Sequence, residues 1–196
     1  MVVLIDSGGA NIASVVFALE RLGVESVLTA DPDIIMSASH VILPGVGAAG
    51  DAMGKLQARG VLEIIRGLVQ PVLGICLGMQ LLFTHSEEGD AAMLDILSGD
   101  VRRFKPEPGK TVPHMGWNRV RMRKDHLLFK DVENESPFYF VHSYFASIGD
   151  YTVGACTHGS ENFSAIVAQD NFMGCQFHPE RSGVAGQQIL KNFLEM

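Results

Sequence analysis

Residues 72–82 read VLGICLGMQLL, and this stretch decides the fold. Pro71 precedes a short, continuously apolar run, Val72–Cys76, which is typical of a β-strand covered on both faces. A helix is expected to begin near Met79, soon after the run. A buried strand that leads straight into a helix is the repeating unit of an α/β protein with a parallel sheet.

The residues before this stretch repeat the same alternation of strand and helix. Short apolar runs predict strands at Val2–Ile5, Val24–Leu28 and His40–Leu43. Helical spacing predicts helices at Ile12–Leu19, Asp51–Arg59 and Val61–Val69. The first helix is expected to have Asn11 as its N-cap and to stop at Gly23. Strands separated by helices predict a parallel sheet with helices on both faces.

The second half of the chain is rich in strand-forming runs bounded by Gly, Pro, Asn and Asp turns. These runs are Val101–Phe104, Trp117–Met122, Pro137–Ala146, Thr152–Cys156, Ala165–Ala168 and Met173–Phe177. A final helix is expected over Gly186–Leu194. We therefore predict an α/β fold in a single domain, residues 1–196. Its mostly parallel central sheet is flanked by helices and gains a mixed or antiparallel extension from the later strands.

Composition narrows the class of protein. Of the 196 residues, 47% are hydrophobic and 19% are charged, which is a globular and not a disordered composition. The formal net charge of −7 argues against a nucleic-acid partner, because binding the phosphate backbone needs many Lys and Arg contacts. The longest apolar stretch, Val72–Phe83, is too short to cross a bilayer, and no signal peptide is recognised. Three cysteines make no framework of paired disulfides, so we expect a cytoplasmic protein without membrane association.

Cys76 lies between two glycines in the pattern small-x-nucleophile-x-small, which serine hydrolases use for a nucleophile on a sharp strand-to-helix turn. The turn is so tight that a Cβ at Gly74 or Gly78 would collide with the neighbouring strand or helix. It also places the sulfur at a helix N-terminus, whose partial positive charge favours the thiolate. The alternative is a small buried core residue, and that is how we interpret Cys156 and Cys175.

A candidate base follows the last strand. Pro179 biases His178 toward an extended backbone, and residues two apart on an extended chain point the same way, so His178 and Glu180 are expected to share a face. A carboxylate placed there holds the imidazole in one tautomer while the other ring nitrogen takes a proton from a thiol. The alternative is a surface histidine beside a surface glutamate. Cys76, His178 and Glu180 are therefore the candidate catalytic residues.

The loop Pro44–Gly47 closes another strand and supplies backbone N–H groups. Those of Val46 and Gly47, with that of Leu77, are candidates for an oxyanion hole, although an ordinary glycine-rich turn has the same composition. The remaining histidines show no metal-ligand spacing with cysteines or carboxylates: His40, His85, His114, His126, His142 and His158. We therefore predict neither a metal nor a cofactor.

Residues 74–80 (GICLGMQ) and 176–180 (QFHPE) resemble the class I, or triad, glutamine amidotransferases, and the resemblance covers nearly the whole chain. It implies a flavodoxin-like fold and an enzyme that hydrolyses glutamine to glutamate and ammonia. By this resemblance Cys76 forms a glutamyl thioester, and His178, oriented by Glu180, passes a proton to the departing ammonia. The implied contacts to the amino-acid end of the substrate are Gly47, Gln80, His142, Ser143 and Tyr144.

Three further stretches, residues 44–47 (PGVG), 113–118 (PHMGWN) and 139–144 (YFVHSY), narrow the resemblance to a branch that serves histidine biosynthesis. That branch implies a heterodimer in which ammonia passes to a separate (β/α)8 cyclase subunit. Candidates for the contact face are residue types enriched at interface cores: Met115, Trp117, Tyr139 and Arg181. For Trp117 the alternative is a core aromatic on a strand. Residues 8–11 (GGAN) depart from the expected pattern, in which glycine directly precedes the asparagine.

Other functions remain open at this point. Another branch of the same class, serving anthranilate, purine or pyridoxal phosphate synthesis, would carry different residues at 44–47 and 114–118. Many cysteine peptidases and thiol-stress proteins on a similar scaffold place a histidine directly after the nucleophile, where this chain has Leu77. A binding module with a degenerate site is disfavoured by the intact Cys76, His178 and Glu180.

Overall fold

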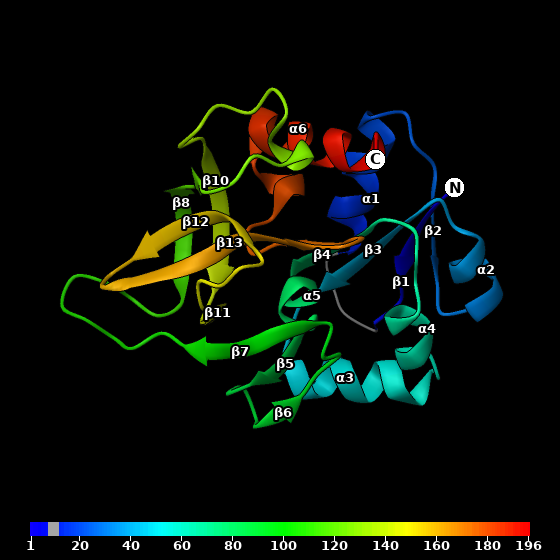
Figure 1. The fold of residues 1–196 in the computed structure, drawn as a ribbon, viewed down its shortest axis with the longest axis horizontal. Helices are drawn as coiled ribbons and strands as arrows, with labels where there is room; N and C mark the ends of the chain where they lie inside the picture. The colour runs from blue at the N-terminus through cyan, green and yellow to red at the C-terminus, as the bar shows by residue number, and fades with distance from the viewer. Residues whose placement is uncertain (8–11) are drawn as a thin grey trace.

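The central sheet has eight strands in the order β2-β1-β3-β4-β14-β13-β12-β9 (Figure 1). The computed structural model describes residues 1–7 and 12–196. The parallel part contains Ser26–Thr29 (β2), Val2–Ile5 (β1), His40–Gly45 (β3), Val72–Cys76 (β4) and Phe172–Cys175 (β14). The antiparallel part contains Glu161–Gln169 (β13), Thr152–His158 (β12) and Arg121–Met122 (β9). The predicted fold, a mostly parallel sheet with an antiparallel extension, is confirmed.

Helices cover both faces of the sheet because its inner strands are apolar on both sides. The helices are Ile12–Arg21 (α1), Pro32–Ser37 (α2), Ala49–Ala58 (α3), Leu62–Arg66 (α4) and Gly183–Leu194 (α6). Along β1, Val2 and Leu4 belong to the same core as the buried residues of α1 and α6. Val3 and Ile5 point the other way, into the core beneath α2, α3 and α4. Figure 1 shows α1 and α6 above the sheet and α3 below it.

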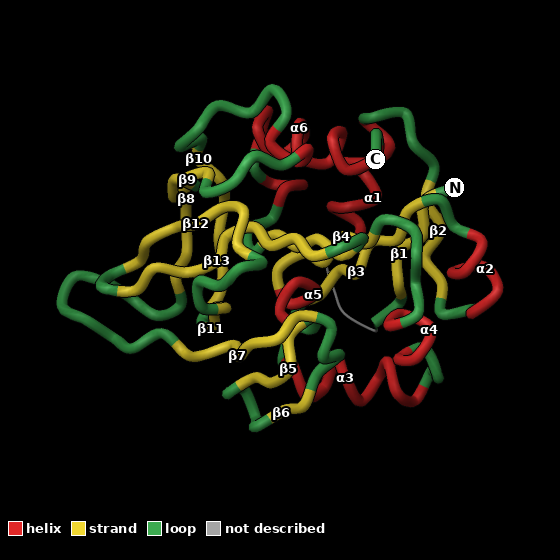
Figure 2. The backbone as a smooth tube through the Cα atoms, in the orientation of Figure 1, coloured by secondary structure: helices red, strands yellow, loops and turns green. Residues whose placement is uncertain are grey.

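Two smaller sheets adjoin the central one. The four-stranded sheet contains Tyr144–Ala146 (β11), Leu97–Arg103 (β7), Phe83–Ser86 (β5) and Ala91–Ala92 (β6), in that order. The two-stranded sheet pairs Pro137–His142 (β10) with His114–Arg119 (β8). The shortest elements are Leu77–Gln80 (α5) and the 3-10 turns Leu127–Phe129 (η1) and Pro179–Arg181 (η2). Figure 2 shows β8, β10 and β11 gathered toward the β12 side of the central sheet, away from β2.

The structure contains helices and strands that the sequence does not predict. Helix α2 has a complete N-terminal signal, because the Asp31 side chain accepts hydrogen bonds from the backbone N–H of Asp33 (2.9 Å) and Ile34 (3.3 Å). Strands β5 and β6 are too short to show a periodicity of their own. The run predicted over Pro137–Ala146 is two strands in different sheets, separated at Ser143.

The run predicted over Trp117–Met122 is likewise divided between β8 and β9, which belong to different sheets. Other predicted elements differ mainly at their ends. For example, β2 begins at Ser26, α4 ends at Arg66, and α6 begins at Gly183. The expected N-cap Asn11 and the departure at residues 8–11 lie outside the described residues. None of the helices in the described part of the chain combines the length and apolar character that a bilayer crossing requires.

Candidate active site

Cys76 lies at the strained end of β4, directly before α5. Its backbone has φ 53° and ψ −110°, a conformation that costs a non-glycine residue about 1–3 kcal/mol. A Cβ at Gly74 would lie 2.5 Å from the carbonyl oxygen of Gly78, and one at Gly78 would lie 1.8 Å from the carbonyl oxygen of Leu43. The predicted need for glycine on both sides of Cys76 is therefore confirmed. Helix α5 is a single turn, Leu77–Gln80, so its dipole favours the Cys76 thiolate less than the predicted longer helix would.

His178 and Glu180 form a buried pair behind the thiol. The Nδ1 atom of His178 lies 2.8 Å from Oε1 of Glu180, and the two side chains are 5% and 1% exposed. His178 is extended as predicted, at φ −97° and ψ 97°, but Glu180 belongs to the turn η2 and not to an extended segment. The reason given for the pairing is therefore wrong, because the 3-10 turn, and not strand alternation, returns the carboxylate to the ring. The backbone N–H of His178 donates to the carbonyl oxygen of Tyr139 at 2.9 Å.

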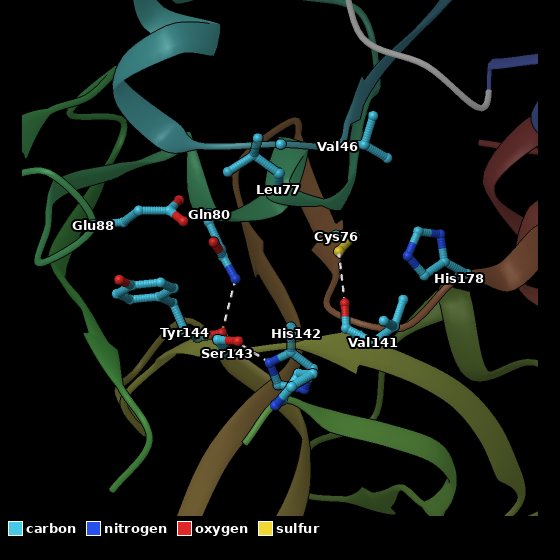
Figure 3. Close-up of a pocket in the computed structure, with 12 residues that line it drawn as sticks. Val46, Cys76, Leu77, Gln80, Glu88, Val141, His142, Ser143, Tyr144 and His178 are labelled. Atoms are coloured by element: carbon cyan, nitrogen blue, oxygen red, sulfur yellow. Dashed lines mark hydrogen bonds between the residues drawn. The ribbon is translucent and has the colours of Figure 1, made fainter. Parts of the chain in front are cut away.

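The surroundings of His178 favour its protonated form. Burial lowers its pKa, but hydrogen bonds to Cys76 and Glu180 and the negative charges of these groups outweigh burial and raise the pKa to about 10. Figure 3 shows the Cys76 sulfur beside the His178 ring at one end of a pocket. The structure thus brings Cys76, His178 and Glu180 together, and their arrangement is that of a nucleophile, a proton carrier and its orienting carboxylate.

The other two thiols are in a different environment. Cys156 and Cys175 are 3% and 0% exposed. Burial raises the pKa of Cys156 to about 12 and that of Cys175 well above its usual value, with the Glu180 and Cys76 charges adding to the second shift. Both thiols therefore stay protonated and unreactive, in agreement with their predicted packing role.

A pocket of about 420 Å³ opens beside Cys76, a suitable volume for a small polar molecule. It is lined by all the predicted oxyanion and substrate residues: Val46, Gly47, Leu77, Gln80, His142, Ser143 and Tyr144. In residues 1–7 and 12–196, no three His, Cys, Asp or Glu side chains gather as metal ligands would.

Glu88 is a pocket residue that the sequence does not predict, and it lies at the far end of this pocket from His178 (Figure 3). Its Oε2 accepts a hydrogen bond from the backbone N–H of Ala49 at 2.8 Å, and its own N–H donates to Oγ of Ser86 at 3.1 Å. These two bonds hold a carboxylate at the pocket wall. In the sequence, Glu88 stands beside Glu87 and Gly89, a composition that reads as a solvated turn.

Gln80 is fixed by bonds inside the protein. Its Nε2 donates to the carbonyl oxygen of Tyr144 and to Oε1 of Gln176, both at 2.9 Å. Gln176, also without a role in the sequence reading, directs its Nε2 to the Cys76 sulfur at 3.8 Å. Both hydrogens of the Gln80 amide are thus used. Its oxygen accepts no hydrogen bond from the described residues and remains for a ligand in the pocket.

The loop that follows β3 lies over the thiol. Gly47 has φ +100°, and a Cβ added there would meet nothing within 4 Å, so the backbone at this residue has room to turn. Gly45 has a different role, because a Cβ there would lie 2.5 Å from the backbone nitrogen of Gly78. The conformational freedom of this loop therefore lies at Gly47 and not at Gly45.

An exposed cluster lies on β8, β10 and η2. Trp117 and Tyr139 are register partners, and their rings are 6.0 Å apart. The guanidinium carbon of Arg181 lies 4.9 Å from the Tyr139 ring centre, within cation–π range. Met115 and Trp117 are 63% and 59% exposed, so the alternative interpretation of Trp117 as a core aromatic is wrong. We call Met115, Trp117, Tyr139 and Arg181 the β8–β10 face.

The nucleophile turn and the sequence motifs agree with the comparison to known families. The family model "Glutamine amidotransferase class-I" matches residues 3–196. The chain therefore belongs to the class-I glutamine amidotransferase family. Within this family it groups with proteins called imidazole glycerol phosphate synthase subunit HisH. One from Xanthomonas axonopodis pv. citri is 51% identical, with 100% of this chain and 97% of the relative covered. Another, from Xylella fastidiosa strain Temecula1, is 52% identical with the same coverage.

Solved structures agree on the fold. A structure described as glutamine amidotransferase has a TM-score of 0.74 at 17% identity and covers 100% of this chain and 98% of its own. A glutamine amidotransferase from Thermotoga maritima has a TM-score of 0.63 at 18% identity, with 99% and 82% covered. These likenesses extend over the complete α/β architecture.

Proposed function

We propose that this chain is the glutaminase subunit of a heterodimeric imidazole glycerol phosphate synthase. It hydrolyses glutamine and delivers ammonia to a (β/α)8 cyclase subunit, which forms imidazole glycerol phosphate and aminoimidazole carboxamide ribotide in histidine biosynthesis. We place this activity in the cytoplasm. The observation that carries the proposal is the strained Cys76 beside the buried His178–Glu180 pair, in a chain 51% identical to a HisH subunit over its full length.

The pocket binds glutamine with its amide toward Cys76. At the far end, the Glu88 carboxylate and the free Gln80 oxygen are both acceptors, and they match the ammonium group of an amino acid. The backbone of Ser143 and Tyr144 completes this end of the pocket, and that of Gly47 lines the pocket as well. The amide carbon then lies within reach of the sulfur.

In the first half-reaction, the Cys76 sulfur attacks the side-chain amide carbon of glutamine. Negative charge develops on the amide oxygen, and the backbone N–H groups of Gly47 and Leu77 stabilise it, at about 3–4 kcal/mol per donor. Val46 is the alternative loop donor. His178 gives its proton to the amide nitrogen, the C–N bond breaks, and ammonia leaves a glutamyl thioester on Cys76.

In the second half-reaction, water cleaves the thioester. The now neutral His178 takes a proton from the water as its oxygen attacks the carbonyl carbon, and the C–S bond breaks. Glutamate leaves, and the sulfur and the protonated His178 return to their starting state. Glu180 keeps the ring in one tautomer throughout, since it accepts from Nδ1.

The β8–β10 face is the docking surface for the cyclase. It combines an exposed tryptophan, a methionine and an arginine stacked on a tyrosine, the residue types that dominate interface cores. This face is connected to the active site through the backbone of Tyr139, whose carbonyl oxygen accepts a hydrogen bond from the N–H of His178. Docking also excludes water, which keeps ammonia from being protonated and lost as a nucleophile.

The proposed function is tested by measuring glutamate release from the purified chain with and without the cyclase and its nucleotide ligand. We expect slow release from the chain alone and at least about 10-fold faster release from the liganded complex, because Gly47 must turn its loop to complete the oxyanion site. Full turnover by the chain alone would contradict this gating. Peptide cleavage without glutamine hydrolysis would favour the thiol-peptidase alternative instead.

Replacing Glu88 with glutamine is expected to raise KM for glutamine about 10-fold or more and to change kcat little. The substitution removes the charge that meets the substrate ammonium but no reacting group. Steady-state kinetics of the complex measures both constants. Glu87→Gln is the matched control, because the Glu87 carboxylate accepts from the backbone N–H of Arg103 outside the pocket. Equal KM values for E88Q and the wild type would rule out the proposed ammonium contact.

A further inference from the structure

Three histidines, to which the sequence reading assigns no metal, gather beneath the pocket. His114 Nδ1 lies 3.0 Å from His142 Nε2, and the ring of His158 stacks on that of His114 at 4.2 Å. His114 and His142 are only 4% and 6% exposed. The two are register partners on β8 and β10, far apart in sequence and adjacent in the sheet.

The His114–His142 pair lies in a longer hydrogen-bond chain with defined ends. At one end, Asn118 directs its Nδ2 to Nε2 of His114 at 3.2 Å. The amide orientation of Asn118 is fixed, because its Oδ1 accepts from the N–H of Arg119 (2.8 Å) and its Nδ2 also donates to the carbonyl oxygen of Thr157 (2.9 Å). At the other end, Nδ1 of His142 lies 2.8 Å from the carbonyl oxygen of Tyr144.

These ends permit one arrangement of protons. A carbonyl oxygen only accepts, so His142 carries its proton on Nδ1 and leaves Nε2 as an acceptor. His114 must then donate from Nδ1, and its Nε2 accepts from Asn118. A second proton on either ring would place two donors face to face. Both rings are therefore neutral, and every bond points from Asn118 toward Tyr144.

The electrostatic surroundings agree with neutral rings. Burial, together with smaller contributions from the charges of His158 and Lys110, lowers the pKa of His114 to about 4. Burial lowers the pKa of His142 to about 3, against the opposing effect of its bond to Tyr144 and with smaller contributions from the neighbouring histidines. Both shifts favour the neutral rings that the hydrogen-bond geometry requires.

We propose that His114 and His142 are positioning residues, a one-directional hydrogen-bond relay that holds the Tyr144 carbonyl against Gln80. This carbonyl oxygen accepts both from His142 Nδ1 and from Gln80 Nε2. By fixing it, the relay fixes which way the Gln80 amide faces, and so keeps an acceptor oxygen toward the substrate ammonium. The role of Gln80 toward substrate rests on the proposed function.

The kinetic test uses His142→Phe, which keeps an aromatic ring among Phe104, Phe140 and Phe163 but removes the donor to Tyr144. We expect KM for glutamine to rise about 10-fold. Ammonia-dependent synthesis by the complex is expected to stay unchanged, which reports folding and assembly. His142→Asn, whose Nδ2 occupies nearly the place of the ring Nδ1, is expected to restore KM to within about 3-fold of the wild type.

His158→Phe is the matched control. His158 belongs to the same stack, but its Nε2 bonds to the carbonyl oxygen of Thr111 and not to the relay. If KM rose as much for H158F as for H142F, the effect would come from general packing of the histidine rings, and the relay would be ruled out. Because the relay acts through Gln80, the double variant H142F/Q80M is expected to have the same KM for glutamine as the single variant Gln80→Met. The same fold-increase in both backgrounds would overturn the proposal.

A spectroscopic arm separates this proposal from the proposed function. Nitrogen-15 NMR of the ring nitrogens is expected to show His114 and His142 neutral and protonated on Nδ1 at pH 6. A cationic ring, or a proton on Nε2 of either, would overturn the relay whatever the catalytic activity. Absence of glutaminase activity in the wild-type complex would instead overturn the proposed function.

Discussion

Replacing Cys76 with alanine is expected to abolish glutamine-dependent synthesis by the complex while added ammonia still supports it fully. The substitution removes the only group that forms the thioester in our mechanism, and loss of an enzyme nucleophile lowers turnover by at least about 1,000-fold. The cyclase site lies on another chain and does not need the sulfur when ammonia is supplied. Product formation with glutamine and with ammonium salts, measured side by side, gives both rates.

The matched control for this prediction is Cys156→Ala. Cys156 is as buried as a core residue, and its raised pKa keeps the thiol protonated. Its loss is expected to leave the glutamine-dependent rate nearly unchanged. If C76A lost the ammonia-dependent rate to the same extent as the glutamine-dependent rate, Cys76 would be a structural residue and the mechanism would be wrong.

Replacing Gly78 with alanine is expected to destabilise the folded protein strongly. In a helix, alanine is favoured over glycine by about 1 kcal/mol, but the added Cβ would lie 1.8 Å from the carbonyl oxygen of Leu43 on β3. The carbonyl oxygen belongs to the backbone of β3, and the Cβ is fixed directly to the backbone of α5, so relief requires α5 and β3 to separate. Overpacking of this kind costs about 3 kcal/mol or more, a large part of the about 5–15 kcal/mol that stabilises a typical domain.

The midpoint of urea unfolding measures this effect. Gly54→Ala is the control, because Gly54 lies inside α3 and a Cβ there meets nothing within 4 Å. It is expected to keep or raise the midpoint, by up to about 1 kcal/mol in the free energy of unfolding. An unchanged midpoint for G78A would mean that the nucleophile turn is looser than the structure has it.

The parts of the fold that the sequence predicts well are those that local pattern determines. The β4 strand has the predicted bounds, because Pro71 opens an apolar run and Cys76 must leave it in a positive-φ turn. The proximity of Cys76 and His178, which are far apart in sequence, can also be predicted from a simple rule. They lie at or just beyond the ends of adjacent parallel strands, β4 and β14, and such ends meet at one edge of a sheet.

The parts that the sequence does not predict depend on pairing between distant segments. His114 and His142 meet because β8 and β10 pair in one register, which no local spacing reveals. Glu88 enters the pocket because Ser86 and the backbone of Ala49 hold it there, and neither contact leaves a periodic trace. The His178–Glu180 pair is predicted by local spacing, but its cause is different: the extended His178 precedes the 3-10 turn η2, and this turn returns the Glu180 carboxylate to the ring.

The most direct measurement of the central claim is to trap the glutamyl intermediate and map its attachment. The complex with its cyclase and nucleotide ligand is mixed with glutamine, quenched in acid during turnover, and digested for peptide mass spectrometry. We predict a mass increase of one glutamyl group, carried only by the peptide that contains Cys76 and absent from C76A. A glutamyl group on Cys156 or Cys175, or continued turnover of glutamine by C76A, would contradict the account.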